Sequence, residues 1–253
     1  MAFLEVSHVK KIYGEKGRTQ TEALKEVDFS VEKGEFIAIM GESGSGKTTL
    51  LNILATLDRP SKGQVMLEGR DISQIKDKEV AAFRRNELGF VFQDFHLLES
   101  FSNRDNIYLP LVLSGKSEET MKKKVESLAG ILGIEEFLDR YPFEISGGQK
   151  QRIAFARALM NEPRLLLADE PTGALDSKSA KNIMELMERI HKEGQTIFMV
   201  THSVKSAAFA SRVLFIKDGI VYHEIYKGDC SRSEFAEKIH ETLVFLEEKG
   251  ELS

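Results

Sequence analysis

The sequence has 253 residues, of which 42% are hydrophobic, and a formal net charge of −5 at neutral pH. This length allows a large α/β domain with a substantial core, and no apolar run approaches the roughly eighteen residues that a membrane span requires. The acidic balance argues against nucleic acid as a main partner, because nucleic-acid-binding surfaces are normally basic. The first residues lack the pattern of an export signal, and Cys230 is the single cysteine, so we expect a protein of the reducing cytoplasm.

The first part of the chain has the pattern of strands that lead into a helix. Apolar and polar residues alternate from Val27 to Val31, as in a half-buried strand, and the next apolar run ends at Gly41. The elements expected here are strands at 27–31, 35–41, 64–69 and 89–93 and a helix from Thr48 to Leu57.

The segment from about residue 94 to residue 161 has helical character instead. In its clearest helix Ser117 is the expected cap, and apolar residues recur at helical spacing at Met121, Val125, Leu128 and Leu132. The lysines at 122–124 lie between positions of this apolar face, so we interpret them as a solvated outer face.

Strands return after Pro163. Apolar runs at 165–168 and 197–200 predict buried parallel strands, and between them an amphipathic helix is expected to stop at Gly194. Asp218-Gly219 between apolar runs predicts a hairpin. A capped helix is expected from Ser231, with an apolar stripe that either packs on its own domain or binds a partner: Phe235, Ile239, Leu243 and Leu246.

The motif GESGSGKT has the features of a phosphate-binding loop between a strand and a helix. Glycines let backbone N–H groups converge on anionic oxygens at a helix N-terminus. Lys47 is expected to contact the β- and γ-phosphates, and Thr48 to offer a hydroxyl to Mg²⁺. The alternative is a merely flexible loop. The predicted nucleotide-binding residues are Gly41, Glu42, Ser43, Gly44, Ser45, Gly46, Lys47, Thr48 and Thr49.

Three further side chains follow the ends of buried strands. Asp169 is expected to bind Mg²⁺ and Glu170 to orient or deprotonate the attacking water, because ligands bind at the carboxyl ends of parallel strands. His202 ends another strand and could sense the γ-phosphate. The alternatives are solvated charges or a helix cap for the two carboxylates, and a structural role for the histidine.

Ser146-Gly147-Gly148 begins a predicted helix and forms a second candidate anion site, through a capping hydroxyl and exposed backbone N–H groups. A monomer that binds one ATP needs only one such site. We therefore expect head-to-tail pairing of two subunits, with each ATP held between the phosphate loop of one and the serine-glycine helix of the other.

With these motifs in place, the sequence resembles the nucleotide-binding subunits of ABC transporters over nearly its whole length. The resemblance implies that Tyr13 stacks on adenine and that Gln93 contacts Mg²⁺ and the attacking water. It matches residues 146–149, including Gln149, to the family's signature, Asp176 to its D-loop and His202 to its switch histidine. Ile145 replaces the usual leucine of the signature, and Ser203 stands where many relatives have aspartate.

The fold implied is an α/β P-loop NTPase (RecA-like) core with an N-terminal antiparallel β subdomain and an inserted α-helical subdomain. We expect one ATPase domain over residues 1–230, with the helical insertion at about 94–161, and a C-terminal helical extension over 231–253. The resemblance also implies ATP and Mg²⁺ as cofactors and ATP hydrolysis as the activity.

The implied assembly is a homodimer across two ATP on the cytoplasmic face of the membrane, attached through an integral-membrane permease. The sequence is most similar to ATPases of bacitracin-type antimicrobial-peptide resistance transporters, which pass a signal to a sensor kinase. Alternatives are the lipoprotein-release, macrolide-export and cell-division branches, or a nucleotide-dependent scaffold with little turnover. Soluble ABC ATPases of DNA repair or translation fit less well, because no long coiled-coil insertion or second cassette is present. Residues 95–98 form either part of the permease groove or ordinary core.

Overall fold

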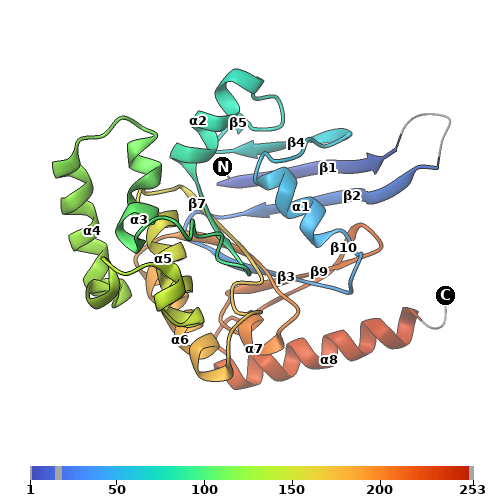
Figure 1. Ribbon diagram of the computed structural model, residues 1–253. Coiled ribbons are helices and arrows are strands. Elements are labelled where there is room, and N and C mark those ends of the chain that lie inside the picture. Colours follow the sequence, from blue (N-terminus) through green and yellow to red (C-terminus); the bar gives the residue numbers. More distant parts are fainter. Residues whose placement is uncertain (1, 15–18, 251–253) are drawn as a thin grey trace. The chain divides into compact units, whose positions relative to one another are not determined.

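The computed structural model describes residues 2–14 and 19–250, the last four of these by their backbone alone. It consists of two compact units (Figure 1). One holds the described residues up to Lys76 together with those from Thr196 onward, and the other runs from Asp77 to Gln195. The domain boundaries predicted above stay a prediction, and residues 251–253 of the predicted extension lie outside the described residues. Among the helices that the structure describes, none has the length and apolar character of a membrane span.

The first unit begins with antiparallel strands, as predicted for the N-terminal subdomain. Strand β1 lies between β2 and β4, with Leu4 opposite both Val31 and Leu67, and β5 pairs with β4. The alternation predicted for β2 is present, since Val27 and Val31 are buried while their neighbours are exposed or half-buried. The strands are β1 (Leu4–Tyr13), β2 (Thr21–Val31), β4 (Lys62–Leu67) and β5 (Arg70–Asp71).

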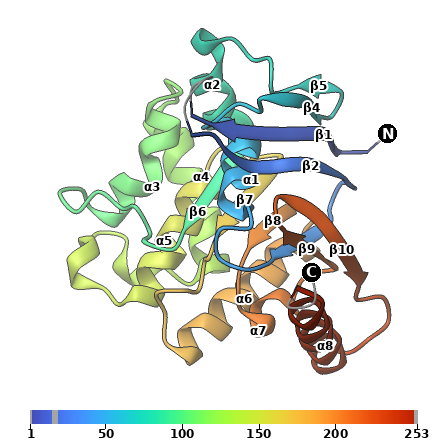
Figure 2. The same cartoon turned by 90° about the vertical axis from the view of Figure 1, so that its right-hand side faces the viewer.

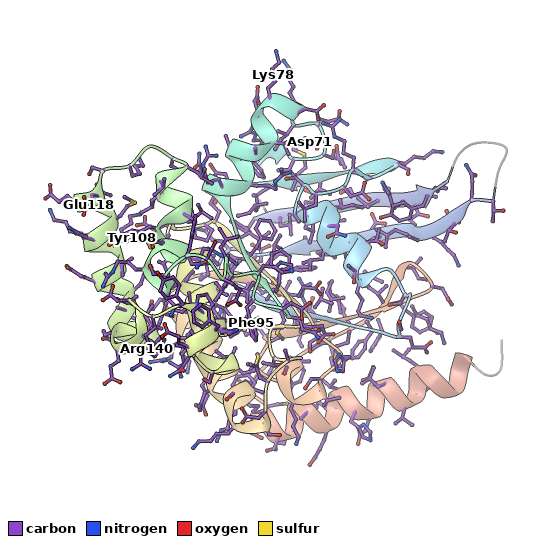
Figure 3. All side chains as sticks on the ribbon, in the orientation of Figure 1. Asp71, Lys78, Phe95, Tyr108, Glu118 and Arg140 are labelled. Carbon is purple, nitrogen blue, oxygen red and sulfur yellow. The ribbon has the colours of Figure 1, made fainter. Side chains whose placement is uncertain are left out.

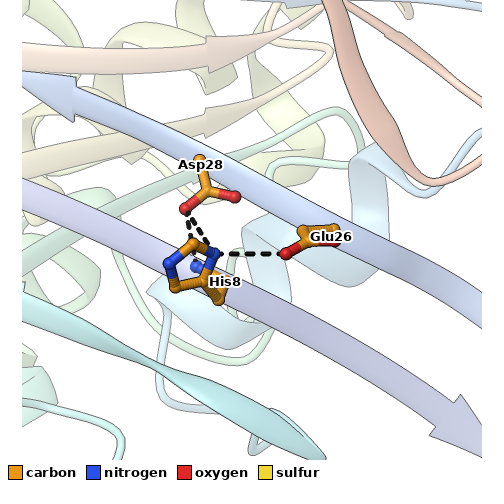
Figure 4. Close-up of side chains that lie close together, drawn as sticks. All are labelled: His8, Glu26 and Asp28. Carbon is orange, nitrogen blue, oxygen red and sulfur yellow. Dashed lines mark hydrogen bonds and ion pairs between the residues drawn. The ribbon is translucent and has the colours of Figure 1, made fainter.

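The pairing of β1 with β2 is interrupted near His8, which has a backbone φ of 51°. Its imidazole Nδ1 lies 3.2 Å from a carboxylate oxygen of Glu26 and 3.2 Å from one of Asp28 (Figure 4). The backbone N–H of His8 also donates to Asp28 at 2.8 Å. Two carboxylates from the neighbouring strand thus hold the irregular backbone in place.

The parallel part of the first unit has β3 (Phe36–Met40) at its centre. This strand lies between β8 (Thr196–Val200) and β9 (Arg212–Lys217), and all five of its residues are buried. Strand β10 (Ile220–Tyr226) pairs with β9 through the predicted hairpin, in which Asp218 and Gly219 have φ of 50° and 77°. Two successive residues of positive φ are what a tight hairpin turn requires.

The helices of the first unit are α1 (Lys47–Leu54), α7 (Val204–Ala207) and α8 (Arg232–Gly250). The prediction that the first helix would reach Leu57 was wrong. Thr56 takes a φ of 53°, and the N–H groups of residues 57 and 58 bond back to the carbonyl of Asn52. A left-handed residue ends an α-helix because it turns the chain away from the helix axis.

The predicted helix at the C-terminal end is α8, drawn in red in Figures 1 and 2. Its capping box is formed, because Ser231 N–H donates to Glu234 at 2.8 Å and Glu234 N–H to the Ser231 hydroxyl at 3.3 Å. Phe235 and Ile239 are fully buried and Leu246 is nearly so, while Leu243 is half-buried. The stripe therefore packs on the protein's own domain, and α8 contacts α7.

The second unit contains two parallel strands and most of the helices. Strand β6 (Leu88–Phe92) pairs in parallel with β7 (Leu165–Asp169), and helices α2 and α5 pack on β6. The helices are α2 (Asp77–Glu87), α3 (Asn103–Val112), α4 (Glu118–Leu132), α5 (Gly147–Leu159) and α6 (Ser177–Lys192), with short 3₁₀ turns at Glu135–Phe137 and Pro142–Glu144.

Helix α4 confirms the predicted cap and apolar face. The Ser117 side chain accepts a hydrogen bond from the N–H of Thr120, and Met121, Val125 and Leu132 are buried. The lysines on its outer side are exposed or half-buried and pair with carboxylates at 2.7 Å: Lys122 with Glu118, Lys123 with Glu119, and Lys124 with Glu162. They form a solvated face, as predicted.

Candidate nucleotide-binding and catalytic site

The phosphate loop joins β3 to α1 in the first unit, where the sequence placed it. Its backbone depends on glycine at two positions. A Cβ atom on Gly41 would lie 2.1 Å from the carbonyl oxygen of Ile216, and one on Gly46 would lie 2.6 Å from that of Ala23. Both have positive φ, at 155° and 104°. The loop can therefore adopt this conformation only because positions 41 and 46 carry no side chain.

Lys47 is the first residue of α1 and folds back over the loop. Its ammonium group donates to the carbonyl oxygens of Gly41 at 2.7 Å and Glu42 at 2.6 Å. The Ser45 hydroxyl is buried without a hydrogen-bond partner. Helix α1 has no side-chain cap, so the N–H groups of its first turn face the loop. Of the remaining predicted residues, Glu42, Ser43, Gly44 and Thr48 are exposed and Thr49 is half-buried.

Tyr13 is the last residue of β1, and 41% of it is exposed. Its hydroxyl donates to Asp58 at 2.8 Å, and the ammonium of Lys11 lies 4.8 Å from the ring centroid. Burial, followed by the hydrogen bond to Asp58, raises the pKa of the Tyr13 phenol. The predicted adenine-stacking residue is thus an accessible ring with a defined orientation.

His202 lies at the same edge of the sheet as the phosphate loop. Strands β3 and β8 are parallel, with Ile39 opposite Val200, and the N–H of Thr201 donates to the carbonyl oxygen of Ile39 at 3.1 Å. His202 follows as an exposed residue. Ser203 caps α7 by accepting from the N–H of Ser206 at 3.2 Å. Serine and aspartate both serve as caps at a helix start, so this position keeps a capping side chain.

The second unit places Gln93, Asp169 and Glu170 at one sheet edge. Strands β6 and β7 are paired in parallel register up to Phe92 opposite Asp169, so Gln93 and Glu170 leave the two strands at the same level. Glu170 has a φ of 44°, in the left-handed region that non-glycine residues rarely adopt. Such a backbone is held only where the surrounding structure enforces it, and it is frequent at functional sites.

The side chain of Gln93 is exposed and lies against Gly173, three residues beyond Glu170. A Cβ atom on Gly173 would come within 2.9 Å of the Gln93 amide carbon and oxygen. The N–H of Gly173 donates to the carbonyl of Glu170 at 2.9 Å, which closes a tight turn. The missing side chain at position 173 leaves room for the glutamine beside the glutamate.

The helix start at which the sequence predicts a second anion site is the beginning of α5. Ser146 caps the helix by accepting from the N–H of Gln149 at 3.4 Å, and the Gln149 side chain accepts from the N–H of Ser146 at 2.9 Å. This capping box occupies two of the donors at the helix start. Ser146 is exposed, and Gly147 and Gly148 are half-buried.

The predicted D-loop residues lie next to this helix start. A Cβ atom on Gly147 would lie 3.3 Å from the Leu175 side chain, and one on Gly148 would lie 3.0 Å from the Ser179 hydroxyl. Asp176 caps α6 by accepting from the N–H groups of residues 178 and 179. Hydrogen bonds from Ser179 lower the pKa of the Asp176 carboxyl. The glycines of the signature thus allow close packing on α6 within one subunit.

Two residues of α5 that the sequence reasoning did not assign connect this helix to the strand ends. Gln151 is fully buried, and its amide nitrogen donates to the carbonyls of Phe92 at 3.2 Å and Pro171 at 2.7 Å. Helical spacing could have indicated it, because Gln151 lies three residues before the buried Ala154 and four before the buried Phe155.

Arg157 is the second such residue. Its guanidinium donates to the carbonyl of His96 at 2.6 Å and to that of Phe95 at 2.9 Å, and burial lowers its pKa. Both residues have positive φ, 60° at Phe95 and 49° at His96. They belong to the loop that begins after Gln93, in which Phe95 is labelled in Figure 3. No pattern in the sequence marks an arginine that bonds to backbone carbonyls of a distant loop.

Comparison with known proteins identifies the family of the chain. Residues 24–173 match the family described as "ABC transporter". The bacitracin export ATP-binding protein BceA of Halalkalibacterium halodurans is 48% identical over 96% of this chain and 96% of its own. The macrolide export ATP-binding/permease protein MacB of a Shewanella species is 46% identical over 86% of this chain, which spans 33% of that protein.

Among solved structures, a dimeric post-hydrolysis state of the ATP-binding cassette MJ0796, bound to ADP and phosphate, has a TM-score of 0.80. It is 38% identical and covers 88% of this chain and 98% of its own. The fold is that of a P-loop NTPase with an N-terminal antiparallel part and an inserted helical part, as predicted. The chain belongs to the ABC transporter family, and it is an ATP-hydrolysing ATP-binding subunit of that family.

Proposed function

We propose that this ATPase pairs with a second copy around two ATP molecules and drives a separate membrane permease that confers resistance to antimicrobial peptides. The observation that carries the proposal is the match to the bacitracin export protein over 96% of both chains. That extent supports the same division of labour here, with an ATP-binding subunit acting on a different permease chain.

The pairing is supported by the second anion-binding helix start, at Ser146. The solved neighbour with ADP and phosphate is itself dimeric. We assign one ATP to each phosphate loop and to the Ser146–Gln149 segment of the opposite subunit. Each γ-phosphate then adds charge-assisted hydrogen bonds from both subunits, worth on the order of 1.5–3 kcal/mol each. Two or three such bonds per site close the dimer, and hydrolysis with phosphate release lets it open.

In the catalytic step, Lys47 contacts the β- and γ-phosphates, in place of the carbonyls that it now bonds. Glu170 orients or deprotonates the attacking water, Gln93 helps to position that water, and His202 contacts the γ-phosphate. Asp176 lies beside the opposite nucleotide, and Tyr13 stacks on the adenine. The left-handed backbone of Glu170 and the sheet edge that it shares with Gln93 support these roles.

We also propose that Mg²⁺ accompanies each ATP, with Thr48, Gln93 and Asp169 as its protein ligands. A hydroxyl, an amide oxygen and a carboxylate are the oxygen donors that this hard cation prefers. The shared strand ends of Gln93 and Asp169 fit that assignment. Bound by these residues, Mg²⁺ would supply positive charge that stabilises the phosphates during hydrolysis.

The permease contact is assigned to the loop after Gln93 on the second unit, at the cytoplasmic face of the membrane. Leu98 is 43% exposed and Phe101 41% exposed, which favours an interface over ordinary core at this loop. Phe95 and Leu97 are half-buried and belong to the support of the loop. A sensor kinase reached through the permease is the further partner that this branch implies.

The experiment is a pull-down of tagged Glu170→Gln protein from membranes of the native host in ATP. This variant is expected to bind ATP without hydrolysing it and to stay closed around it. Recovery of a permease with about ten spans and a large outer domain would support the proposal. Recovery of a four-span permease would favour macrolide, lipoprotein or cell-division complexes, for which the relationship to MacB is the specific argument. Recovery of soluble partners alone would contradict a transport role.

Turnover of the purified wild-type protein with and without that permease separates a transporter from a scaffold. A transporter is expected to hydrolyse ATP faster with its permease present. Unchanged and very slow turnover would favour the scaffold reading. Lys47→Ala serves as the second variant, and nucleotide affinity that survives this change would contradict the role of the loop.

A further inference from the structure

The end of β1 and the chain just beyond α1 meet at three side chains of the first unit. The ammonium of Lys11 lies 2.5 Å from one carboxylate oxygen of Asp58, and the Tyr13 hydroxyl donates to the other at 2.8 Å. Lys11 also donates to the carbonyl of Arg59 at 2.9 Å. One carboxylate therefore bridges an ammonium and a phenol that are two residues apart on the same strand.

This cluster is more enclosed than a typical surface ion pair. The Lys11 side chain is 13% exposed and that of Asp58 is 27% exposed. Burial opposes ionisation of Asp58, but the hydrogen bonds from Lys11, Tyr13 and the Arg59 N–H prevail, and the pKa of the carboxyl is lowered. Asp58 is thus an anion, and both of its carboxylate oxygens accept hydrogen bonds. The Tyr13 phenol therefore has a fixed partner.

The cluster also determines which surface of the tyrosine ring is available. The Lys11 ammonium lies over the ring at 4.8 Å from its centroid, so it covers one face. The hydroxyl is fixed by Asp58 at the edge, and 41% of the residue remains exposed. A planar base can stack only on the face that Lys11 does not cover.

The cluster is joined to the phosphate loop through α1. Asp58 lies beyond the last turn of this helix, and its backbone N–H donates to the carbonyl of Asn52 within the helix at 3.1 Å. The ring is therefore fixed relative to the helix whose N-terminus carries Lys47. The spacing between a stacked base and the bound phosphates is set by one rigid element.

We propose that Asp58 and Lys11 are positioning residues that hold the Tyr13 ring ready to stack on the base of the nucleotide. This inference rests on the proposed stacking role of Tyr13 and adds the residues that preorganise it. A ring that is already fixed loses less side-chain freedom when the base binds. The effect is confined to the base and does not extend to the phosphates.

The test measures the binding of two ligands to the full chain by calorimetry: Mg²⁺-ATP and Mg²⁺-triphosphate, which has no base. Asp58→Asn keeps the shape of the side chain and removes its charge, and Tyr13→Phe removes only the hydroxyl. Each is expected to weaken ATP binding about threefold to tenfold, which corresponds to the entropic cost of immobilising one side chain on binding. Triphosphate binding is expected to stay unchanged. The double variant is expected to bind ATP no more weakly than the weaker single variant, because both changes act on the one hydrogen bond between Tyr13 and Asp58.

Steady-state kinetics gives a second measure of the same effect. The KM for ATP is expected to rise with little change in kcat, since the base takes no part in the chemical step. Glu68→Gln is the matched control, because it neutralises the carboxylate of another lysine pair in the same unit, with Lys33 at 3.6 Å. It is expected to behave as wild type for both ligands.

Two results would overturn the inference. Equal weakening of ATP and triphosphate in Asp58→Asn would mean that the residue supports the loop or the fold, and unchanged ATP affinity would mean that the ring needs no support. Tyr13→Ala separates these from failure of the stacking role. If Tyr13→Ala binds ATP as wild type does, the stacking assignment itself is wrong. If it binds ATP weakly while Asp58→Asn does not, only the positioning role fails.

Discussion

The buried side-chain amide of Gln151 donates a 2.7 Å hydrogen bond to the carbonyl of Pro171, the residue directly after Glu170. The same amide reaches the carbonyl of Phe92, directly before Gln93. The helix that begins at Ser146 is therefore bonded to both strand ends that carry the proposed water-positioning residues. Its position and theirs cannot change independently within one subunit.

We expect Gln151→Met to lower kcat by about tenfold or more, because misplacement of catalytic groups by a fraction of an ångström has effects of this size. ATP affinity is expected to stay within about twofold of wild type, since Lys47 and the glycines of the phosphate loop are unchanged in this variant. Single-turnover kinetics and equilibrium binding give the two values.

Gln195→Met is the matched control for this change. Gln195 also donates to two backbone carbonyls, those of Pro163 and Arg164, but at the opposite end of β7. Loss of its bonds is expected to destabilise the fold by about 1–3 kcal/mol without a matching fall in kcat. Equal losses of kcat in the two variants would show that Gln151 acts on stability alone.

Gly173→Ala is expected to disable catalysis while the protein stays folded. The added methyl group would meet the Gln93 amide at 2.9 Å, and because that side chain is exposed it can move aside. We expect an unfolding free energy within about 1 kcal/mol of wild type and kcat reduced by about tenfold. Gly130→Ala, in the exposed face of α4, is the control and should raise stability by about 0.5–1 kcal/mol with normal turnover. Normal turnover of Gly173→Ala would contradict the assigned position of Gln93.

Phe235→Ala is expected to destabilise the protein by about 3–5 kcal/mol, because this residue of α8 is fully buried. Phe245 lies on the same helix and is 52% exposed, so Phe245→Ala should cost less than about 1.5 kcal/mol. Urea unfolding of both variants gives the comparison. Similar values would mean that α8 is attached more loosely than its buried residues indicate.

The ion pair of Arg104 with Asp139 predicts a pH dependence of stability. The guanidinium donates to both carboxylate oxygens, at 2.7 and 3.0 Å, and holds the pKa of Asp139 below its ordinary value. The stabilisation is therefore fully present above the pKa of an unfolded aspartate and disappears as the pH falls through the lowered folded value. At neutral pH the unfolding free energy of wild type should exceed that of Asp139→Asn by less than about 1 kcal/mol, because the ion pair is exposed.

The check is urea unfolding of both proteins from about pH 3 to pH 7. The two stabilities are expected to converge toward the acidic end. A difference that persists or grows there would rule out the carboxylate as its source.

The sequence predicts the elements that carry strong periodicity and the motifs that lie between them. The strands β3, β7 and β8 are continuous apolar runs, and the glycine pattern before Lys47 requires the loop that is found. Helix α2 escaped prediction because Phe83 is its only buried residue among those described, so it has almost no apolar face. Hydrophobic periodicity in a sequence reflects the face of a helix or strand that is buried. A helix with one buried residue therefore shows little periodicity.

The contacts around the site could not be predicted in the same way. Gln151 and Arg157 bond to backbone carbonyls, which every residue possesses, so no partner in the sequence marks them. The two positive φ values at Phe95 and His96 likewise occur at residues without a turn pattern. Their carbonyls bond to an arginine 62 and 61 positions further along the chain, and this tertiary contact overrules local preference.

The position of β3 between β8 and β9 has a consequence for how the protein is made. Ile37 pairs with Phe198 on one side and with Arg212 on the other, so both neighbours of the strand that carries the phosphate loop leave the ribosome long after it does. Until then this strand has two unpaired edges, and the loop lacks the Ile216 carbonyl that lies against Gly41. A polypeptide interrupted before β9 is completed has its lysine and glycines but no finished nucleotide pocket. The surroundings of the phosphate loop are thus complete only after β9 has been synthesised.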